Sequence, residues 1–308
     1  MPNPDLAAAL ATIAAALDTP PAPTVDLAPV LDDIVALRSR VEELEAAAPA
    51  LLVVDPSGTP LGETLPGARH PQVDTLLTAV SARDARGARL NVWIAGPAGS
   101  GKTFAAEQVA GALGLAFGFH GAMTYAHELL GFVDAGGRYH STQFVALFEN
   151  GGVCLLDELD SGTSEALLAL NAALANGQMS LPDGRIVKRH ADFVCLGAAN
   201  TFGAGATAEY VGRNKLDGAF LSRFPVKLAW EYDPDLERAI CGNSGWAEEV
   251  QTARARAASA GLKVLIDPRH SMAGAALLAA GMDRATVARL TYLAGLTDAQ
   301  VSLIGGGA

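Results

Sequence analysis

The middle of the chain alternates between short apolar runs and amphipathic stretches. Runs that predict strands lie at 90–95, 115–119, 153–157, 192–198 and 225–230. Stretches that predict helices lie at 71–82, 102–113, 142–149 and 163–175. Strands that are apolar on both faces are typical of a parallel sheet covered by helices on both sides. The pattern therefore predicts an α/β fold with a parallel sheet flanked by helices.

Two helices are predicted before this region. Over 5–18, leucine and isoleucine recur at spacings of four and three residues, and the proline-rich stretch 19–24 ends that helix. The second helix starts at Asp26, a good N-cap. Its apolar positions are Leu27, Val30, Ile34, Leu37, Val41 and Leu44. This heptad seam indicates either a hairpin with the first helix or a surface that docks another subunit or a partner.

The flanking segments complete the domain plan. Residues 51–66 predict a short hairpin about a Pro-Ser-Gly turn, and from Asp233 onward the pattern is helical throughout. We therefore expect an N-terminal helical hairpin over 1–50, a nucleotide-binding α/β core over 51–232 and a helical lid over 233–308.

Composition narrows the class of protein. Half of the 308 residues are hydrophobic and 18% are charged, which excludes wholesale disorder. The net charge of −11 argues against a surface that grips nucleic acid throughout. There is no apolar run of membrane-spanning length and no basic start typical of a secretory signal. We therefore expect no membrane contact. The three cysteines form no CxxC pair, so we expect reduced thiols in a cytoplasmic protein.

A phosphate-binding loop lies between the first predicted strand of the sheet and a helix. The residues fit G-x-x-x-x-G-K-[ST] and run Gly96, Pro97, Ala98, Gly99, Ser100, Gly101, Lys102 and Thr103, with Phe104 next. Glycines let main-chain N–H groups surround phosphates, and the helix adds its positive N-terminus. Lys102 would reach the β- and γ-phosphates of a bound nucleotide, and the Thr103 hydroxyl would bind Mg²⁺.

Two further apolar runs end in polar residues. The run 153–156 is followed by Asp157 and Glu158, and the run 192–199 ends at Asn200. Ligands bind at the carboxyl ends of strands in open α/β sheets, so these side chains should meet the loop. Asp157 would hold Mg²⁺ through water, and Glu158 would deprotonate the attacking water. Asn200 would hydrogen-bond the γ-phosphate or that water, or else cap the next turn.

These motifs together resemble the AAA+ ATPases, most closely the MoxR-like and cobaltochelatase small-subunit-like branch related to dynein. The resemblance spans about residues 65–285. Its markers are GPAGSGKT at 96–103, ELLGFVDAGGRYH at 128–140, GGVCLLDELD at 151–160, GAAN at 197–200, LDGAFLSRF at 216–224 and IDPRHSMAGAALLAAG at 266–281. The resemblance implies a P-loop AAA+ core, a parallel sheet flanked by helices, with a C-terminal helical lid.

The resemblance also implies roles for single residues. Asn200 would be the sensor 1 residue, and Arg269 the sensor 2 arginine carried by the lid. Arg223 would be the arginine finger that reaches into a neighbouring subunit's ATP, where such a charge raises the rate about 10³–10⁵-fold. Arg213 is the alternative finger. His70 would lie near the adenine.

Two inserts typical of this branch occur. Phe132 lies in the first, and the second is a predicted hairpin over 177–192 with Arg185, Lys188 and Arg189. These four residues either contact substrate or are a packed aromatic and a solvated basic turn.

The resemblance implies a Mg²⁺-dependent ATPase that assembles as a homo-oligomeric ring, usually of six subunits. The ring would remodel or activate a partner protein in a chaperone-like manner, often one with a von Willebrand A domain. The alternatives are a nucleic-acid-translocating motor and a ring that nucleotide merely holds together.

Overall fold

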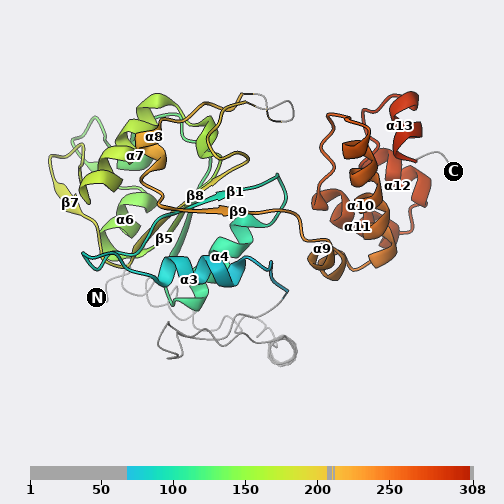
Figure 1. Ribbon diagram of the computed structural model, residues 1–308. Helices are drawn as coiled ribbons and strands as arrows, with labels where there is room; N and C mark the ends of the chain where they lie inside the picture. Colours follow the sequence, from blue (N-terminus) through green and yellow to red (C-terminus); the bar gives the residue numbers. More distant parts are fainter. Residues whose placement is uncertain (1–67, 207–209, 211, 306–308) are drawn as a thin grey trace, which may run out of the picture. The chain divides into compact units, whose positions relative to one another are not determined.

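The computed structural model describes residues 68–206, 210 and 212–305 (Figure 1). All of them belong to the unit formed by residues 49–308. The predicted N-terminal hairpin over 1–50 and the hairpin over 51–66 lie outside the described residues. Within the described part, no helix has the length and apolar character needed to cross a membrane.

A five-stranded parallel sheet forms the centre of the α/β part. Its strand order is β2-β5-β8-β1-β9, and every neighbouring pair is parallel. This confirms the predicted fold class. The strands are β1 (Val92–Ala95), β2 (Phe117–His120), β5 (Gly152–Leu156), β8 (Phe193–Ala199) and β9 (Val226–Ala229).

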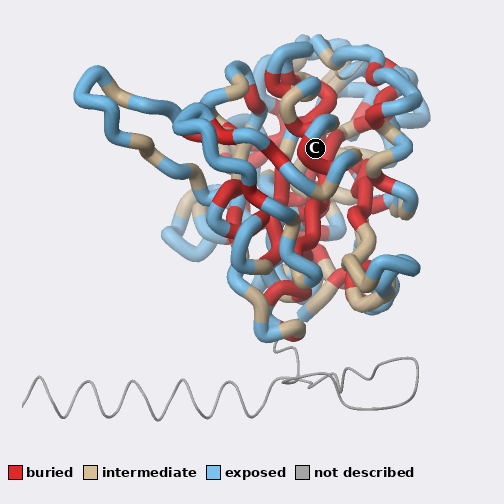
Figure 2. The backbone as a smooth tube through the Cα atoms, turned by 90° about the vertical axis from the view of Figure 1, so that its left-hand side faces the viewer, coloured by how far each residue is buried: buried red, intermediate tan, exposed pale blue. Residues whose placement is uncertain are grey.

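Alternate residues of each strand pack on opposite faces of the sheet. On one face, Val92 and Ile94 of β1 join a core with α3 and α4. On the other, Trp93 and Ala95 join a core with α5, α6 and α7. Both layers are visible in Figure 1, and Figure 2 shows the buried residues gathered inside. These helices are α3 (Val73–Ser81), α4 (Lys102–Ala112), α5 (Ala126–Leu130), α6 (Gln143–Asn150) and α7 (Ser164–Asn176).

Strand β2 begins two residues later than the pattern predicted. The amide N–H of Leu115 donates to the Ala110 carbonyl at 2.9 Å, and Gly114 has a φ of +62°. Helices often end in this way, with a left-handed glycine and a backward hydrogen bond. The end of α4 therefore uses an apolar residue that looked like part of the strand.

Among the described residues, two small hairpins and two short helical elements accompany the main sheet. The predicted hairpin over 177–192 is present as β6 (Gln178–Ser180) and β7 (Ile186–Lys188), joined through the Pro-Asp-Gly turn. A second small hairpin pairs β3 (Phe132–Val133) with β4 (Tyr139–His140). The remaining short elements are η1 (Leu159–Ser161) and α8 (Gly218–Leu221).

The C-terminal part is helical, as predicted, and has a core of its own. Trp246 is fully buried at its centre, and Gly274 lets the helices approach, since a Cβ there would lie 2.1 Å from the indole nitrogen. The helices are α9 (Pro234–Cys241), α10 (Ser244–Ser259), α11 (Pro268–Ala279), α12 (Arg284–Leu290) and α13 (Asp298–Ile304).

Candidate nucleotide site

The loop that follows β1 is fixed by contacts with the neighbouring strands. The N–H of Gly96 donates to the Ala199 carbonyl at 3.1 Å, and a Cβ on Gly96 would lie 1.9 Å from the carbonyl oxygen of Trp230. The indole N–H of Trp230 donates to the Ser100 carbonyl at 3.0 Å. Gly101, with a φ of +86°, takes a left-handed conformation just before α4. The glycines are thus required by close approach and by backbone conformation.

Lys102 is buried under this loop. Its Nζ donates to the carbonyl oxygens of Gly96 and Pro97 at 2.8 and 2.9 Å. Burial lowers the pKa of Lys102 from 10.5 to about 8, while the nearby Asp157 opposes the change. The ammonium group is therefore held at a cost, and it points where the phosphates of a bound nucleotide would lie.

The two acids after β5 take different positions. Oδ1 of Asp157 accepts the N–H of Glu158 at 2.8 Å. Glu158 has a φ of +52°, and no other non-glycine residue of the described chain has a positive φ. Strained backbone of this kind is concentrated at functional sites, where it aims a side chain. Here it leaves the Glu158 side chain half exposed at the carboxyl end of the sheet.

Asn200 and Arg213 form one polar cluster with the acids. Asn200 satisfies its amide when Nδ2 faces the Gly96 carbonyl oxygen at 3.3 Å and Oδ1 faces Nη2 of Arg213 at 2.9 Å. Nη1 of Arg213 donates to Oδ1 of fully buried Asp160 at 3.0 Å, and Nη2 lies 3.5 Å from Oε1 of Glu158. The Arg213 side chain is only 13% exposed. Arg213 therefore serves the acids of its own chain and does not project outward.

Arg223 lies away from this cluster. Its Nε donates to Oδ1 of Asn171 on α7 at 3.1 Å, and its carbonyl oxygen accepts from Asn91 at 3.0 Å. It does not line the cavity around Lys102. Its own chain therefore does not bring Arg223 to the site that the other predicted residues share.

Arg269 enters the site from the helical part. Its side chain is 69% exposed, and Nη1 lies 3.4 Å from Oδ2 of Asp267. Burial alone would raise the pKa of Asp267, but the hydrogen bond and charge of His270, together with the Arg269 charge, hold it below its usual value. Asp267 thus stays an anion that positions Arg269.

Two adjoining cavities complete the site. The first, of about 310 Å³, is lined by the loop and by residues that the sequence predicted as catalytic or metal-binding, namely Lys102, Thr103, Asp157, Glu158, Asn200 and Arg269. The second, of about 340 Å³, is mainly apolar and includes His70, Phe104, Leu236, Ile240 and Met272. The cavities share Gly99, Ser100, Gly101, Phe104 and Met272. A polar and an apolar cavity joined across a phosphate-binding loop match the two ends of a nucleotide.

His70 belongs to the wall of the apolar cavity. Its Nδ1 accepts the N–H of Gln72 at 3.1 Å, so Nε2 carries the proton and donates to the Glu231 carbonyl at 2.8 Å. Its ring stacks on Trp230 with centroids 4.3 Å apart. Both ring nitrogens are therefore used within the fold.

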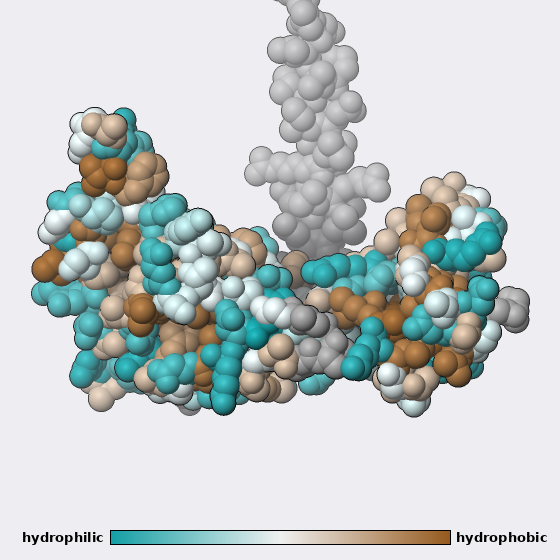
Figure 3. Space-filling view, turned by 90° about the horizontal axis from the view of Figure 1, so that it is seen from above, coloured by the Kyte–Doolittle hydropathy of each residue, from teal (hydrophilic) through white to brown (hydrophobic). Residues whose placement is uncertain are grey.

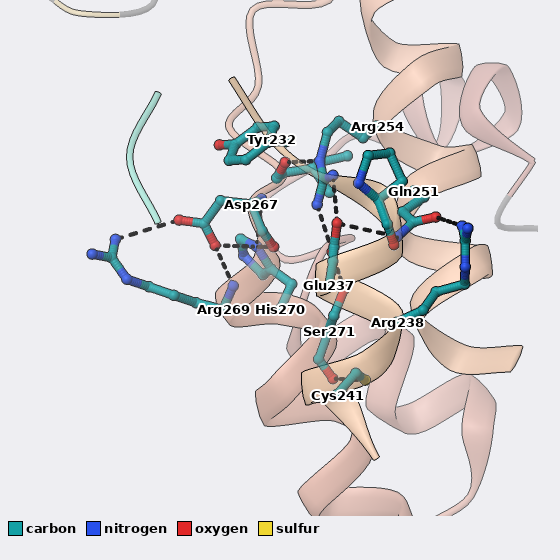
Figure 4. A network of polar contacts seen from close by, with 12 residues as sticks. Tyr232, Glu237, Arg238, Cys241, Gln251, Arg254, Asp267, Arg269, His270 and Ser271 are labelled. Atoms are coloured by element: carbon teal, nitrogen blue, oxygen red, sulfur yellow. Dashed lines mark hydrogen bonds and ion pairs between the residues drawn. The ribbon is translucent and has the colours of Figure 1, made fainter. Parts of the chain in front are cut away.

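A buried network in the helical part was missed by the sequence analysis (Figure 4). Glu237 accepts hydrogen bonds from Nη1 and Nη2 of Arg254, each at 2.8 Å, and one from the Ser271 hydroxyl. The guanidinium lies 4.4 Å from the centre of the Tyr232 ring, and the Tyr232 hydroxyl donates to the Ala98 carbonyl at 2.7 Å. The network thus connects the helical part with the phosphate-binding loop. No local motif marks it, because its members are far apart in the sequence.

Part of the sequence matches a known protein family. The family described as AAA domain (dynein-related subfamily) matches residues 91–224. Among curated proteins no sequence matches this chain. Solved structures with a similar fold include a proline-to-glycine mutant of RuvB from Thermotoga maritima, with 16% identity, a TM-score of 0.43, and coverage of 78% of this chain and 84% of that one.

Another similar structure is a closed-state reconstruction of Hsp104 with ATPγS and FITC-casein. It has 15% identity and a TM-score of 0.41, and the match covers 51% of this chain and 32% of that one. At such scores and identities neither structure informs the activity of this chain. The family match covers the loop, both acids, Asn200 and Arg223.

Proposed function

We propose that this chain, with an AAA domain of the dynein-related subfamily over residues 91–224, is a Mg²⁺-dependent ATPase that works as a homo-oligomeric ring. One observation carries the proposal: a single cavity at the carboxyl end of the sheet is lined by the phosphate-binding lysine, two acids, an asparagine and an arginine from the helical part. This is the set of groups that phosphoryl transfer to water requires.

Binding would begin at the loop. The main-chain N–H groups of 99–103 and the N-terminus of α4 offer partial positive charge to the phosphates. The Lys102 ammonium would exchange its two carbonyl acceptors for phosphate oxygens, which are stronger partners because they are charged. The apolar cavity would take the base.

Thr103 and Asp157 are suited to Mg²⁺. They line one cavity, one supplying a hydroxyl and the other a carboxylate, and Mg²⁺ commonly binds through few protein oxygens plus phosphates and water. The ion would supply neutralisation of phosphate charge. Asp157 is oriented for this by the hydrogen bond that it accepts from the Glu158 main chain.

Glu158 would take a proton from the attacking water. Its half-exposed carboxylate reaches the cavity, and Asn200 beside it can hold the water in line with the γ-phosphate. Arg213 would act within its own subunit as a positioning residue, since it contacts Glu158, Asp160 and Asn200 together. Arg269 would contact the phosphates and connect nucleotide state to the helical part.

Arg223 would complete the site of the adjacent subunit. It lies outside its own cavity, while the exposed Glu158 and Arg269 leave that cavity open to a further cation. A ring of six would place one such arginine at each interface. Large exposed hydrophobic side chains outside the two cavities, among them Leu168 and Phe202, offer surfaces for assembly. The face drawn in Figure 3 carries hydrophobic residues among hydrophilic ones.

The partner of the ring would be a protein. Nucleic-acid binding through β6–β7 is disfavoured because Arg189 donates inward to the main chain of residues 89 and 193 and Arg185 pairs with Asp183 at 2.7 Å. Phe132, 49% exposed beside His140, remains a candidate contact.

The test is Glu158→Gln. It should keep ATP affinity within about threefold while lowering turnover about 10²–10⁴-fold, the usual contribution of a general base. Lys102→Ala should lose both binding and turnover. Glu107→Gln, at an exposed position of α4, is the matched control and should change neither. Undiminished turnover in Glu158→Gln would overturn the assignment.

A further inference from the structure

An unpaired amide lies beside the apolar cavity. Gln108, on α4 one and a half turns after the phosphate-binding loop, lines this cavity. Its Nε2 and Oε1 are both buried, and neither has a hydrogen-bond partner. Buried polar groups are nearly always paired, so an amide with both ends unpaired calls for a ligand or another explanation.

Every other polar side chain that lines this cavity among the described residues is already engaged. His70 uses both ring nitrogens, and Ser100 donates to the Pro97 carbonyl at 2.8 Å. Asp233 caps α9 by accepting two main-chain N–H groups. Tyr232 and Glu237 belong to the buried network. Gln108 is therefore the side chain left to read the polar edge of a base.

We propose that Gln108 selects adenine over guanine, an inference that rests on the proposed ATPase function. A glutamine amide matches the N6 amino group and N7 of adenine, accepting from one and donating to the other. Guanine and hypoxanthine present two acceptors, O6 and N7, on the same edge, so Oε1 of Gln108 would stay unpaired. The terminal amide torsion of glutamine is broad, which lets the amide align with the base.

The spacing of Lys102 and Gln108 along α4 places these side chains at different ends of the site. Gln108 follows Lys102 by six residues on the same helix, which at 1.5 Å per residue separates them by about 9 Å along the axis. Of these two cavities, Lys102 lines the polar one and Gln108 lines the apolar one, and both are lined by the loop residues Gly99–Gly101. Gln108 thus lies at the base end when Lys102 lies at the phosphate end.

The experiment compares ATP, ITP and 7-deaza-ATP by calorimetry with Mg²⁺ on the wild type and on Gln108→Met, which keeps the length and removes the amide. The wild type should bind ATP about 10–100-fold more tightly than ITP, and about tenfold more tightly than 7-deaza-ATP. Gln108→Met should bind all three within about threefold of one another, at the affinity of the wild type for ITP. Gln143→Met, an exposed glutamine on α6, should keep the wild-type preference.

Melting without nucleotide supplies a second readout. Because Gln108→Met removes an unpaired buried amide, its melting temperature should equal or exceed that of the wild type. A wild type that binds the three nucleotides equally, or a Gln108→Met that keeps the preference, overturns this inference and leaves the ATPase proposal standing. A wild type that binds none of them overturns both. The wild-type comparison needs no variant to fold.

Discussion

Lys102→Met should stabilise the protein in the absence of nucleotide, and by an amount that depends on pH. Burial lowers the pKa of Lys102 from 10.5 to about 8. At 1.36 kcal/mol per pH unit, that difference corresponds to about 3 kcal/mol. Below pH 8 both the folded and the unfolded chain hold the proton, so the folded state carries the full cost of the buried charge.

The sign follows from proton binding. Between about pH 8 and 10.5 the unfolded chain binds more protons at this lysine than the folded chain does, so wild-type stability rises with pH. Methionine removes the group that titrates. The advantage of Lys102→Met in free energy of unfolding should therefore shrink by about 3 kcal/mol from pH 7 to pH 10.5. The two hydrogen bonds that Nζ donates add a constant offset, which cancels in this change.

The assay is urea unfolding followed by circular dichroism at pH 7, 8, 9, 10 and 10.5, with wild type and variant side by side. Lys188→Met, at an exposed lysine, controls for the loss of one lysine. The prediction is wrong if the difference in free energy of unfolding between wild type and Lys102→Met is the same at every pH, or if the advantage of the variant grows with pH. Either result would mean that the buried ammonium is not the source of the cost.

Three other perturbations have definite expected outcomes. Gly96→Ala should lower the free energy of unfolding by about 1–3 kcal/mol or more, because its Cβ would lie 1.9 Å from a main-chain oxygen; Gly111→Ala, at an open helix position, is the control in thermal melts. Arg254→Met should lower the free energy of unfolding, measured in urea, by about 3–5 kcal/mol, because the buried Glu237 carboxylate would keep its Ser271 and Gln251 hydrogen bonds but lose its counter-charge. Burial alone would raise the pKa of Glu237, but the hydrogen bonds from Arg254 and Ser271 hold this pKa below its usual value of 4.5. The stabilisation that the ionised Glu237 contributes is therefore full above pH 4.5 and is lost as the pH falls through the pKa of the folded state, which acid titration of the wild type checks. Arg269→Ala should reduce steady-state ATP turnover while changing stability by less than about 0.5 kcal/mol, because its side chain is 69% exposed; a large drop in melting temperature would contradict this.

The sequence predicted the sheet well, and it also predicted which polar side chains lie together at one edge of that sheet. Fully apolar strands before the loop, before Asp157 and before Asn200 place these residues at one edge of a parallel sheet, and the structure has them there. The prediction succeeded because strand period and motif spacing are local properties. Lys102 also lies where the loop motif implies, next to the two acids.

Long-range packing could not be predicted. Arg213 and Arg223 were rival fingers in the sequence, and only the folded chain shows Arg213 bound to Glu158 and Asp160. In the sequence, nothing distinguishes Gln108 from other polar residues of a helix. The cavity that it lines is formed in part by residues more than a hundred positions away, from Tyr232 onward. For the C-terminal part the sequence predicted helices but not where each begins and ends, because its many alanines give only a weak hydrophobic periodicity.

In the proposed ring, Arg213 would act within its own subunit and Arg223 in the site of the adjacent subunit. A site made of two subunits can be rebuilt from two inactive variants when their defects lie on opposite sides of the interface. Lys102 and Arg213 would lie on the same side, and Arg223 on the other. Mixing therefore gives opposite expectations for the two arginines.

ATP turnover per protomer, measured against protein concentration, tests most directly whether Arg223 acts between subunits and Arg213 within one. The samples are the wild type, the single variants, and equal mixtures of Lys102→Ala with Arg223→Ala and of Lys102→Ala with Arg213→Ala. Wild-type turnover should rise cooperatively with protein concentration, and each single variant should be inactive. The Arg223→Ala mixture should regain part of the wild-type rate, and the Arg213→Ala mixture should stay inactive. Recovery of turnover in the mixture with Arg213→Ala, or an Arg223→Ala variant as active as the wild type at every concentration, would contradict this assignment of the two arginines.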